Sequence, residues 1–371
     1  MKCLAFLALM LLPAGADTIL EFDTRAAGED KAIRHWGIDA TWASPDNTRE
    51  SMTHGEPLID FVRIGVYMHR PLQEDGSLSD AQIAKLTHAL GCAEIVAKDV
   101  PIMLSPHNEE GIIGWYKNGD GSAHLDRWLQ AIAATREWVQ GKGHPVAMIE
   151  AFNEPDYEKW NMGTREDLDE LSRRMKPWQV LRVGPSTMST ASAGPWYGEI
   201  HRHVDIGSTH TLYGTMREFI DFAKEVKRDR NQLFCPEAHS IAEVMVGAEV
   251  GVDYAAWWAA ISEARGRFMR ACQGKRLAYA AVEENWSAGS VYRAPDGSLH
   301  AFVGATEREN GITTSYRIVC RNEDVTYFPD GDRENGQPRK RGEAYEVVAK
   351  PAGGSISRWI EIVPASPAGT R

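Results

Sequence analysis

Eight short apolar segments recur between residues 34 and 289, and most of them are followed by an amphipathic or helix-prone stretch. Their interiors are mostly apolar rather than alternating with polar positions, which is typical of strands covered on both faces of a parallel sheet. The segments that predict these strands are 34–40, 60–66, 100–107, 147–155, 180–187, 204–212, 233–239 and 277–286.

The stretches between these segments carry helix signals. Ser79 and Gln82 belong to a candidate capping box, and Ile83, Leu86 and Leu90 then fall on one helix face. Alternating strands and helices, repeated in about eight units over about 250 residues, match a (β/α)8 TIM barrel of the α/β class. A doubly wound sheet is the competing interpretation. It usually has fewer strands, and no G-x-G-x-x-G follows the first segment.

The pattern changes at about residue 290, where helical periodicity stops. Runs rich in β-branched and aromatic residues follow, separated by turn signals such as Pro295-Asp296-Gly297. We therefore expect a small, all-β, sandwich-like domain over residues 290–371, packed on a barrel that spans residues 17–289. The run at 18–22 is a candidate for one more strand of this β-domain.

Residues 1–16 have the features of a secretory signal peptide. Lys2 precedes an apolar run, and the small residues Ala14 and Ala16 suit cleavage after Ala16. The run is too short to anchor the chain across a bilayer. We therefore expect a secreted or periplasmic protein without a membrane span.

The net charge and the cysteines narrow the function classes further. The formal net charge of −11 argues against a nucleic acid or an anionic membrane surface as partner. Four cysteines remain after the leader, and the sequence contains no C-x-x-C, so a structural zinc site is not expected. Disulfides and buried thiols both remain open for Cys92, Cys235, Cys272 and Cys320.

Polar and ionisable residues cluster where the predicted strands end, which is where a (β/α)8 barrel carries its chemistry. Two carboxylates stand out, Glu154 and Glu237, because each follows an apolar strand and the two are three strands apart around the predicted ring. Glycoside hydrolysis uses such a pair, one group as acid and the other as nucleophile or base. The sequence therefore predicts a carboxylate pair across the barrel mouth.

The strand-end motifs resemble those of the clan A glycoside hydrolases, a superfamily of retaining (β/α)8 enzymes. The resemblance covers about residues 34–289 and is loosely closest to family 30, family 39 and agarase- or porphyranase-like members, which carry a β-domain. It rests on six motifs in the order of the strands: VRIGV (62–66), SPHN (105–108), FNEP (152–155), HTLY (210–213), CPEAH (235–239) and ENW (284–286).

The resemblance implies a role for each matching residue. It implies that Glu154 is the acid/base and that Glu237 is the nucleophile. It further implies that Asn153 binds the 2-hydroxyl of the sugar, that Tyr213 donates to Glu237, and that Arg63 lowers the pKa of Glu237. Trp286 would present a flat face to the sugar ring. The remaining residues expected to bind substrate are His107, Asn108, His210 and His239.

No metal or cofactor is expected. His201, His203 and His210 suggest a metal cluster at first sight, but the first two precede the predicted sixth strand and the third ends it, so they face opposite rims.

Together these features predict a secreted retaining β-glycosidase that cleaves a polysaccharide or oligosaccharide by double displacement. Endo action is favoured because aromatic residues occur in several predicted loops: Trp42, Trp115, Tyr116, Trp160 and Trp196. A catalytically silent carbohydrate-binding protein on the same scaffold is the alternative, and a metal-dependent hydrolase is a third hypothesis. The sugar, the linkage and the oligomeric state remain open.

Overall fold

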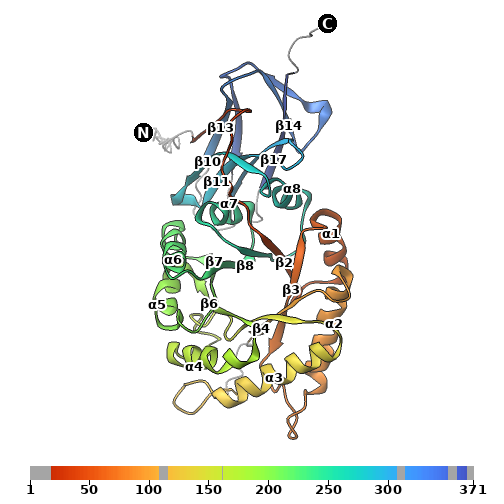
Figure 1. Ribbon diagram of the computed structural model, residues 1–371, viewed down its shortest axis with the longest axis vertical. Coiled ribbons are helices and arrows are strands. Elements are labelled where there is room, and N and C mark those ends of the chain that lie inside the picture. The colour runs from red at the N-terminus through yellow and green to blue at the C-terminus, as the bar shows by residue number, and fades with distance from the viewer. Residues whose placement is uncertain (1–17, 108–115, 161, 307–313, 350–356, 366–371) are drawn as a thin grey trace, which may run out of the picture.

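The computed structural model describes residues 18–107, 116–160, 162–306, 314–349 and 357–365. Its larger part is a closed parallel barrel with helices around it (Figure 1). The eight barrel strands run in chain order around the ring: β2 (His35–Asp39), β3 (Ile59–Tyr67), β4 (Ile102–His107), β5 (Val146–Glu150), β6 (Leu181–Ser189), β7 (Ile206–Tyr213), β8 (Gln232–Ala238) and β9 (Tyr254–Trp257).

Eight helices follow the strands, and seven of them begin at a serine or threonine whose side chain accepts a backbone N–H. The exception is α3, which begins after His124. The predicted cap at Ser79 is present and accepts from the backbone N–H of Gln82. The helices are α1 (Pro45–Gly55), α2 (Asp80–Val96), α3 (Leu125–Gly141), α4 (Arg165–Met175), α5 (Thr190–Ile200), α6 (Met216–Arg228), α7 (Ile241–Val250) and α8 (Glu263–Ala271).

The predicted TIM barrel with a C-terminal β-domain is confirmed, but one predicted barrel strand is wrong. The segment 277–286 does not close the barrel; β10 (Lys275–Val282) pairs with β11 (Ser287–Arg293) outside it. The ring is closed by β9, a four-residue strand that pairs with β8 on one side and β2 on the other. The predicted domain boundary between residues 289 and 290 falls inside β11.

The β-domain consists of two sheets around its own apolar core. The six-stranded sheet has the order β10-β11-β12-β17-β14-β15, and the three-stranded sheet has the order β1-β13-β16. The expected strand at 18–22 is present as β1 (Thr18–Phe22), in parallel pairing with β13. The remaining strands are β12 (Leu299–Ala305), β13 (Thr314–Cys320), β14 (Val325–Pro329), β15 (Gln337–Arg339), β16 (Ala344–Ala349) and β17 (Ser357–Pro364).

The β-domain packs on α7 and α8, which lie between it and the barrel in Figure 1. Phe268 of α8 makes an edge-to-face contact with Phe302 of β12, with ring centroids 5.3 Å apart. Cys92, Cys235, Cys272 and Cys320 are buried free thiols. Among the described helices, none has the length and apolar character to cross a membrane.

Closure of the barrel through so short a strand depends on side-chain packing at the seam between β9 and β2. The buried indoles of Trp257 and Trp36 stack across this seam at 5.8 Å. The guanidinium of Arg265 lies 4.7 Å above the Trp257 ring.

We expect Trp257→Ala to lower the free energy of unfolding by about 3–5 kcal/mol, because it removes a buried aromatic side chain and leaves a cavity. Urea unfolding followed by circular dichroism measures this. Trp42→Ala is the matched control, since Trp42 is 60% exposed and should change stability little. Equal losses in the two variants would contradict the proposed role of the seam.

Candidate active site

The barrel interior divides into an apolar layer and a polar layer above it. Side chains from seven successive strands, β3 to β9, fill the lower part; the buried members of this cluster are Phe61, Met103, Met148, Val183, Ile206, Phe234 and Ala256. The polar layer lies toward the carboxyl ends of the strands, where Arg63, Glu150 and Glu237 project inward and are buried. The apolar layer therefore separates the ionisable groups from the opposite rim of the barrel.

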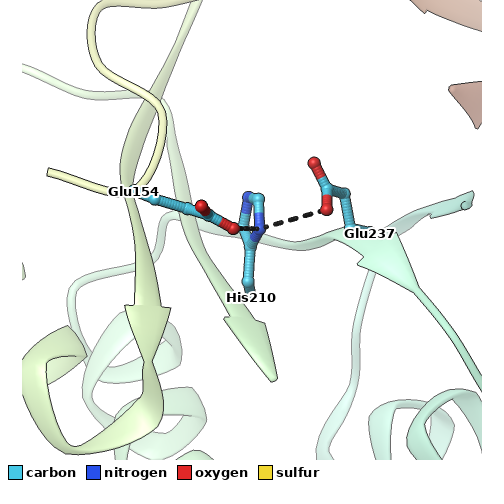
Figure 2. Close-up of side chains that lie close together, drawn as sticks. All are labelled: Glu154, His210 and Glu237. Atoms are coloured by element: carbon cyan, nitrogen blue, oxygen red, sulfur yellow. Dashed lines mark ion pairs between the residues drawn. The ribbon is translucent and has the colours of Figure 1, made fainter. Parts of the chain in front are cut away.

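Glu154 and Glu237 converge on one imidazole (Figure 2). Nδ1 of His210, near the end of β7, lies 2.9 Å from Oε1 of Glu154 and 3.5 Å from Oε2 of Glu237. One potential ligand atom from each of the three residues lies within 4.8 Å of the other two. The predicted convergence of two carboxylates from opposite walls is therefore present.

The backbone around Glu154 fixes where its carboxylate points. Glu154 follows β5 in a left-handed conformation with φ 51°, which is uncommon for a residue with a side chain. Its N–H donates to the carbonyl oxygen of Ser186 at 2.9 Å, and Ser186 is itself left-handed with φ 52°. Such a conformation persists only where neighbouring contacts hold it.

Arg63 of β3 is the buried cation to which several acidic groups attach. Its Nη1 donates to Oε1 of Glu237 at 2.5 Å and also to Asp39. Its Nη2 donates to Oδ1 of Asn153 at 2.6 Å and to Oγ of Ser105 at 2.9 Å. Burial would lower the pKa of Arg63, but the charges of the surrounding carboxylates raise it well above its ordinary value.

The two cations determine the protonation state of Glu237. Burial alone would raise the pKa of this carboxyl, yet the neighbouring His210 and Arg63 hold the pKa well below its usual range. Glu237 is therefore ionised at neutral pH. His210 shows the reciprocal effect: burial disfavours its charge, but Glu237 and Glu154 raise its pKa to about 10. The imidazole is therefore protonated at neutral pH.

Two buried acids of the site were missed in the sequence, Asp39 and Glu150. Burial raises the pKa of both carboxyls, while Arg63 acts in the opposite direction. Each is the last residue of its strand, β2 or β5. Their position at a strand end, on the rim that carries Glu154 and Glu237, is the signal that could have found them.

Asn153 and His107 lie in the same polar layer. Nδ2 of Asn153 is 3.4 Å from Nδ1 of His107, whose Nε2 is 3.3 Å from Oγ of Ser105. Burial and then the charge of Arg63 hold the pKa of His107 well below its ordinary value, so this histidine is neutral. Asn108, the next predicted residue, lies outside the described residues, as does Trp115.

The remaining predicted residues fall at different distances from the two glutamates. His239 follows β8 and places Nε2 3.9 Å from Oε2 of Glu237. Tyr213 ends β7 and is 61% exposed; within the described chain the basic side chains within 4 Å of the Glu237 carboxylate are Arg63, His210 and His239. Trp286 lies between β10 and β11, where it is buried against Phe219 of α6.

A different tryptophan follows the true eighth strand. Trp258, directly after β9, is 39% exposed and stacks on the ring of His239, with centroids 4.9 Å apart. It lines a pocket of about 300 Å³ over the ends of β6 to β9. The other lining residues are Met188, Thr211, Leu212, Tyr213, His239 and Glu243. Oγ1 of Thr211 and Nε2 of His239 are buried without a hydrogen-bond partner among the described residues, so they are available to a bound hydroxyl group.

The cluster of Glu154, His210 and Glu237 also has the residue types of a metal site. Two features make it a poor fit. Arg63 already occupies Oε1 of Glu237, and its positive charge opposes a second cation there. The raised pKa of His210 keeps Nδ1 protonated, whereas a metal needs the neutral ring. As expected, His201 and His203 lie before β7, away from His210 at its far end.

Comparison with solved structures confirms the resemblance to clan A glycoside hydrolases at the level of the fold. A family 30 endoxylanase from Clostridium papyrosolvens C71 matches with a TM-score of 0.56 and 13% identity, over 94% of this chain and 100% of the other. An endo-β1,6-glucanase matches with a TM-score of 0.54 and 9% identity, over 93% and 94%. A family 51 arabinofuranosidase from Xanthomonas axonopodis pv. citri matches with a TM-score of 0.50 and 10% identity, over 93% and 99%. No protein-family model matches the chain, and no curated protein matches it by sequence.

The raised pKa of His210 predicts a pH dependence of stability. A group whose pKa is higher in the folded state stabilises the fold fully below its unfolded pKa, and this contribution is lost as the pH rises toward the folded pKa. For His210 the window runs from 6.5 to about 10. Between pH 6.5 and 8.0, below the ordinary pKa of thiols and phenols in the unfolded chain, we expect a decline on the order of 1.5–2 kcal/mol in the free energy of unfolding.

Urea unfolding at half-unit pH steps measures this decline, and His210→Gln should flatten it. His107 and His300 have lowered pKa values and act in the opposite direction, mostly below pH 6.5, so the difference between wild type and His210→Gln rather than the wild-type slope alone reports His210. A wild-type slope that persists in the variant would assign the effect to another group.

Proposed function

We propose that this protein is a retaining glycoside hydrolase in which Glu154 is the acid/base and Glu237 the nucleophile. The observation that carries the proposal is the contact of both carboxylates with His210 Nδ1, at 2.9 and 3.5 Å. Retaining enzymes hold their carboxyl groups about 5 Å apart, whereas inverting enzymes leave about 6.5–9.5 Å for a water. A cluster whose ligand atoms lie within 4.8 Å of one another favours the retaining geometry.

Glu237 has the properties that a nucleophile needs. Arg63 and His210 keep it ionised, and Arg63 fixes one carboxylate oxygen, which leaves the other nearer the imidazole. In the first step this carboxylate attacks the anomeric carbon as the bond to the leaving oxygen breaks. The product of the step is a glycosyl ester on Glu237.

Glu154 supplies the proton for the leaving oxygen in partnership with His210. The imidazolium lies against the carboxylate of Glu154, so the pair holds a proton beside the scissile bond at neutral pH. Glu154 passes this proton to the leaving oxygen. In the second step it takes a proton from the water that attacks the anomeric carbon, and Glu237 is released as carboxylate.

The surroundings of the pair favour a carbohydrate as substrate. The pocket beside Glu237 combines the apolar faces of Tyr213 and Trp258 with the free polar atoms of Thr211 and His239, a mixture that suits a sugar ring with its hydroxyl groups. Trp42, which follows β2 and is 60% exposed, adds an aromatic face on the other half of the barrel mouth. Aromatic faces on both sides of the mouth support endo action on a β-linked polysaccharide or oligosaccharide. The apolar leader at 1–16 supports export.

Incubation with a panel of polysaccharides, with the anomeric configuration of new reducing ends followed by NMR, tests this proposal. Net retention is expected. Initial inversion would contradict the assignment of Glu237 as nucleophile. Saturable binding without any turnover would favour the carbohydrate-binding alternative, and loss of activity in EDTA would favour the metal-dependent hydrolase.

We expect Glu237→Gln and Glu154→Gln each to lower kcat by at least about 10²–10⁴-fold, because each removes an acid–base or nucleophilic group while keeping its shape. Azide added to the alanine variants provides the control. It should restore turnover and give a glycosyl azide of inverted configuration with Glu237→Ala and of retained configuration with Glu154→Ala. Azide products of the same configuration from both variants would contradict the assigned roles.

We expect Trp258→Ala to raise KM for an oligosaccharide by up to about 10-fold with little change in kcat, because it removes a stacking face of about 1 kcal/mol that contacts no reacting atom. Initial-rate kinetics on the substrate found in the panel measures this. Trp286→Phe is the matched control, since Trp286 packs against Phe219 in the core. A larger rise in KM for Trp286→Phe than for Trp258→Ala would indicate that Trp286, and not Trp258, stacks on the sugar.

A further inference from the structure

A buried carboxylate beneath the two glutamates has no part in the chemistry described above. Glu150, the last residue of β5, lies four positions before Glu154 and is fully buried. Burying a carboxyl group is costly unless hydrogen bonds compensate it. Its two oxygens make separate sets of contacts. One set connects to Glu237 and the other connects to Glu154.

The first oxygen leads to the nucleophile. Oε1 of Glu150 accepts from Oγ of Ser105 at 2.9 Å and lies 3.4 Å from Nη2 of Arg63. Arg63 Nη2 in turn donates to Ser105 at 2.9 Å, while Nη1 donates to Glu237 at 2.5 Å. Glu150 and Ser105 therefore hold the guanidinium whose other nitrogen fixes the carboxylate of Glu237.

The second oxygen leads to the acid/base. Oε2 of Glu150 accepts from Oγ of Ser186 at 3.4 Å. The carbonyl oxygen of the same Ser186 accepts the N–H of Glu154 at 2.9 Å. Ser186 and Glu154 both have a left-handed backbone conformation, which persists only where neighbouring contacts hold it. The hydrogen bond from Ser186 to Glu150 is one of these contacts.

We propose that Glu150 is a positioning residue that joins the two catalytic glutamates from below, through Ser105 and Arg63 to Glu237 and through Ser186 to Glu154. We call this set of contacts the Glu150 bridge. The inference rests on the proposed function, because it gives the bridge a role in catalysis. It makes the spacing of the two carboxylates depend on a third carboxyl group that never meets the substrate.

The bridge has two arms, and each can be removed separately. Ser186→Ala breaks the Glu154 arm and Ser105→Ala breaks the Glu237 arm. Glu150→Leu breaks both with a side chain of similar size. Glu150→Gln keeps an acceptor oxygen and the shape, and burial already raises the pKa of Glu150 toward a neutral state, so the amide should rescue most of the function.

Kinetics with two leaving groups distinguishes the arms. The full chain is assayed with phenyl and 2,4-dinitrophenyl glycosides of the sugar found in the panel, and kcat/KM reports the first bond cleavage. Ser186→Ala should lower kcat/KM about 10-fold for the phenyl glycoside and by less than about 2-fold for the dinitrophenyl glycoside, whose leaving oxygen needs no proton. Ser105→Ala should lower both by about 10-fold, and Glu150→Leu by up to about 100-fold.

A second measurement needs no substrate. In protein labelled with ¹⁵N-histidine, the imidazole signals give the titration of His210, assigned by its loss in His210→Gln. Ser186→Ala and Glu150→Leu should lower the pKa of His210, because the carboxylate of Glu154 moves away from it. Thr187→Val is the matched control. It removes the neighbouring buried hydroxyl, which contacts Thr209 at 2.8 Å, and should leave both the titration and the leaving-group ratio unchanged.

The outcomes separate this inference from the proposed function. If the wild type cleaves no glycoside, the proposed function fails, while the titration still decides whether Glu150 holds Glu154. If Glu150→Leu does not fold, the two serine variants decide. A wild-type leaving-group ratio and an unchanged His210 titration in Ser186→Ala, together with a wild-type kcat/KM in Ser105→Ala, would overturn the bridge and leave Glu150 a structural residue.

Discussion

The architecture of the site depends on one buried cation, the guanidinium of Arg63. A charge inside a barrel is costly unless it is paired and its hydrogen bonds are filled, and a paired set loses far more when one partner is removed than it gains from being there. Arg63 meets this condition with acidic partners from three strands, Asp39 of β2, Glu150 of β5 and Glu237 of β8. The same interaction draws distant parts of the chain to one point and orients the carboxylate proposed as nucleophile.

The carboxyl groups of the polar layer differ in pKa because they have different cationic partners. Burial pushes the pKa of Asp39, Glu150 and Glu237 upward, but Glu237 also contacts His210, and that second cation reverses the direction. Asp39 and Glu150 lack so close a second cation, and the pKa of each stays raised. One apolar interior therefore holds both an ionised carboxylate and carboxyls that resist ionisation.

The sequence predicted the elements with strong patterns and missed those whose pattern was short or hidden. Seven barrel strands were found because their apolar runs are long and lie between amphipathic helices. The eighth was misplaced because β9 has only four residues, while the longer apolar run at 277–282 belongs to the β-domain. The Asn153, Glu154 and Glu237 positions followed from strand ends and that of Arg63 from the resemblance to clan A enzymes, whereas Asp39 and Glu150 were overlooked. Trp258 was missed for the same reason as β9, since its place after the eighth strand is visible only once that strand is known.

The position of the β-domain has a consequence for the same half of the site. It packs on α7 and α8, the helices that follow β8 and β9 and whose preceding loops carry His239 and Trp258. Arg265 of α8 donates to the carbonyl oxygens of His239, at 2.5 Å, and of Trp258, at 3.0 Å. Glu243, in the first turn of α7, accepts the N–H of His239 at 2.7 Å. The pocket wall beside Glu237 is thus held by helices whose opposite faces are covered by the β-domain. The domain acts as a support for the Glu237 side of the barrel, while the Glu154 side relies on the buried contacts of Ser186.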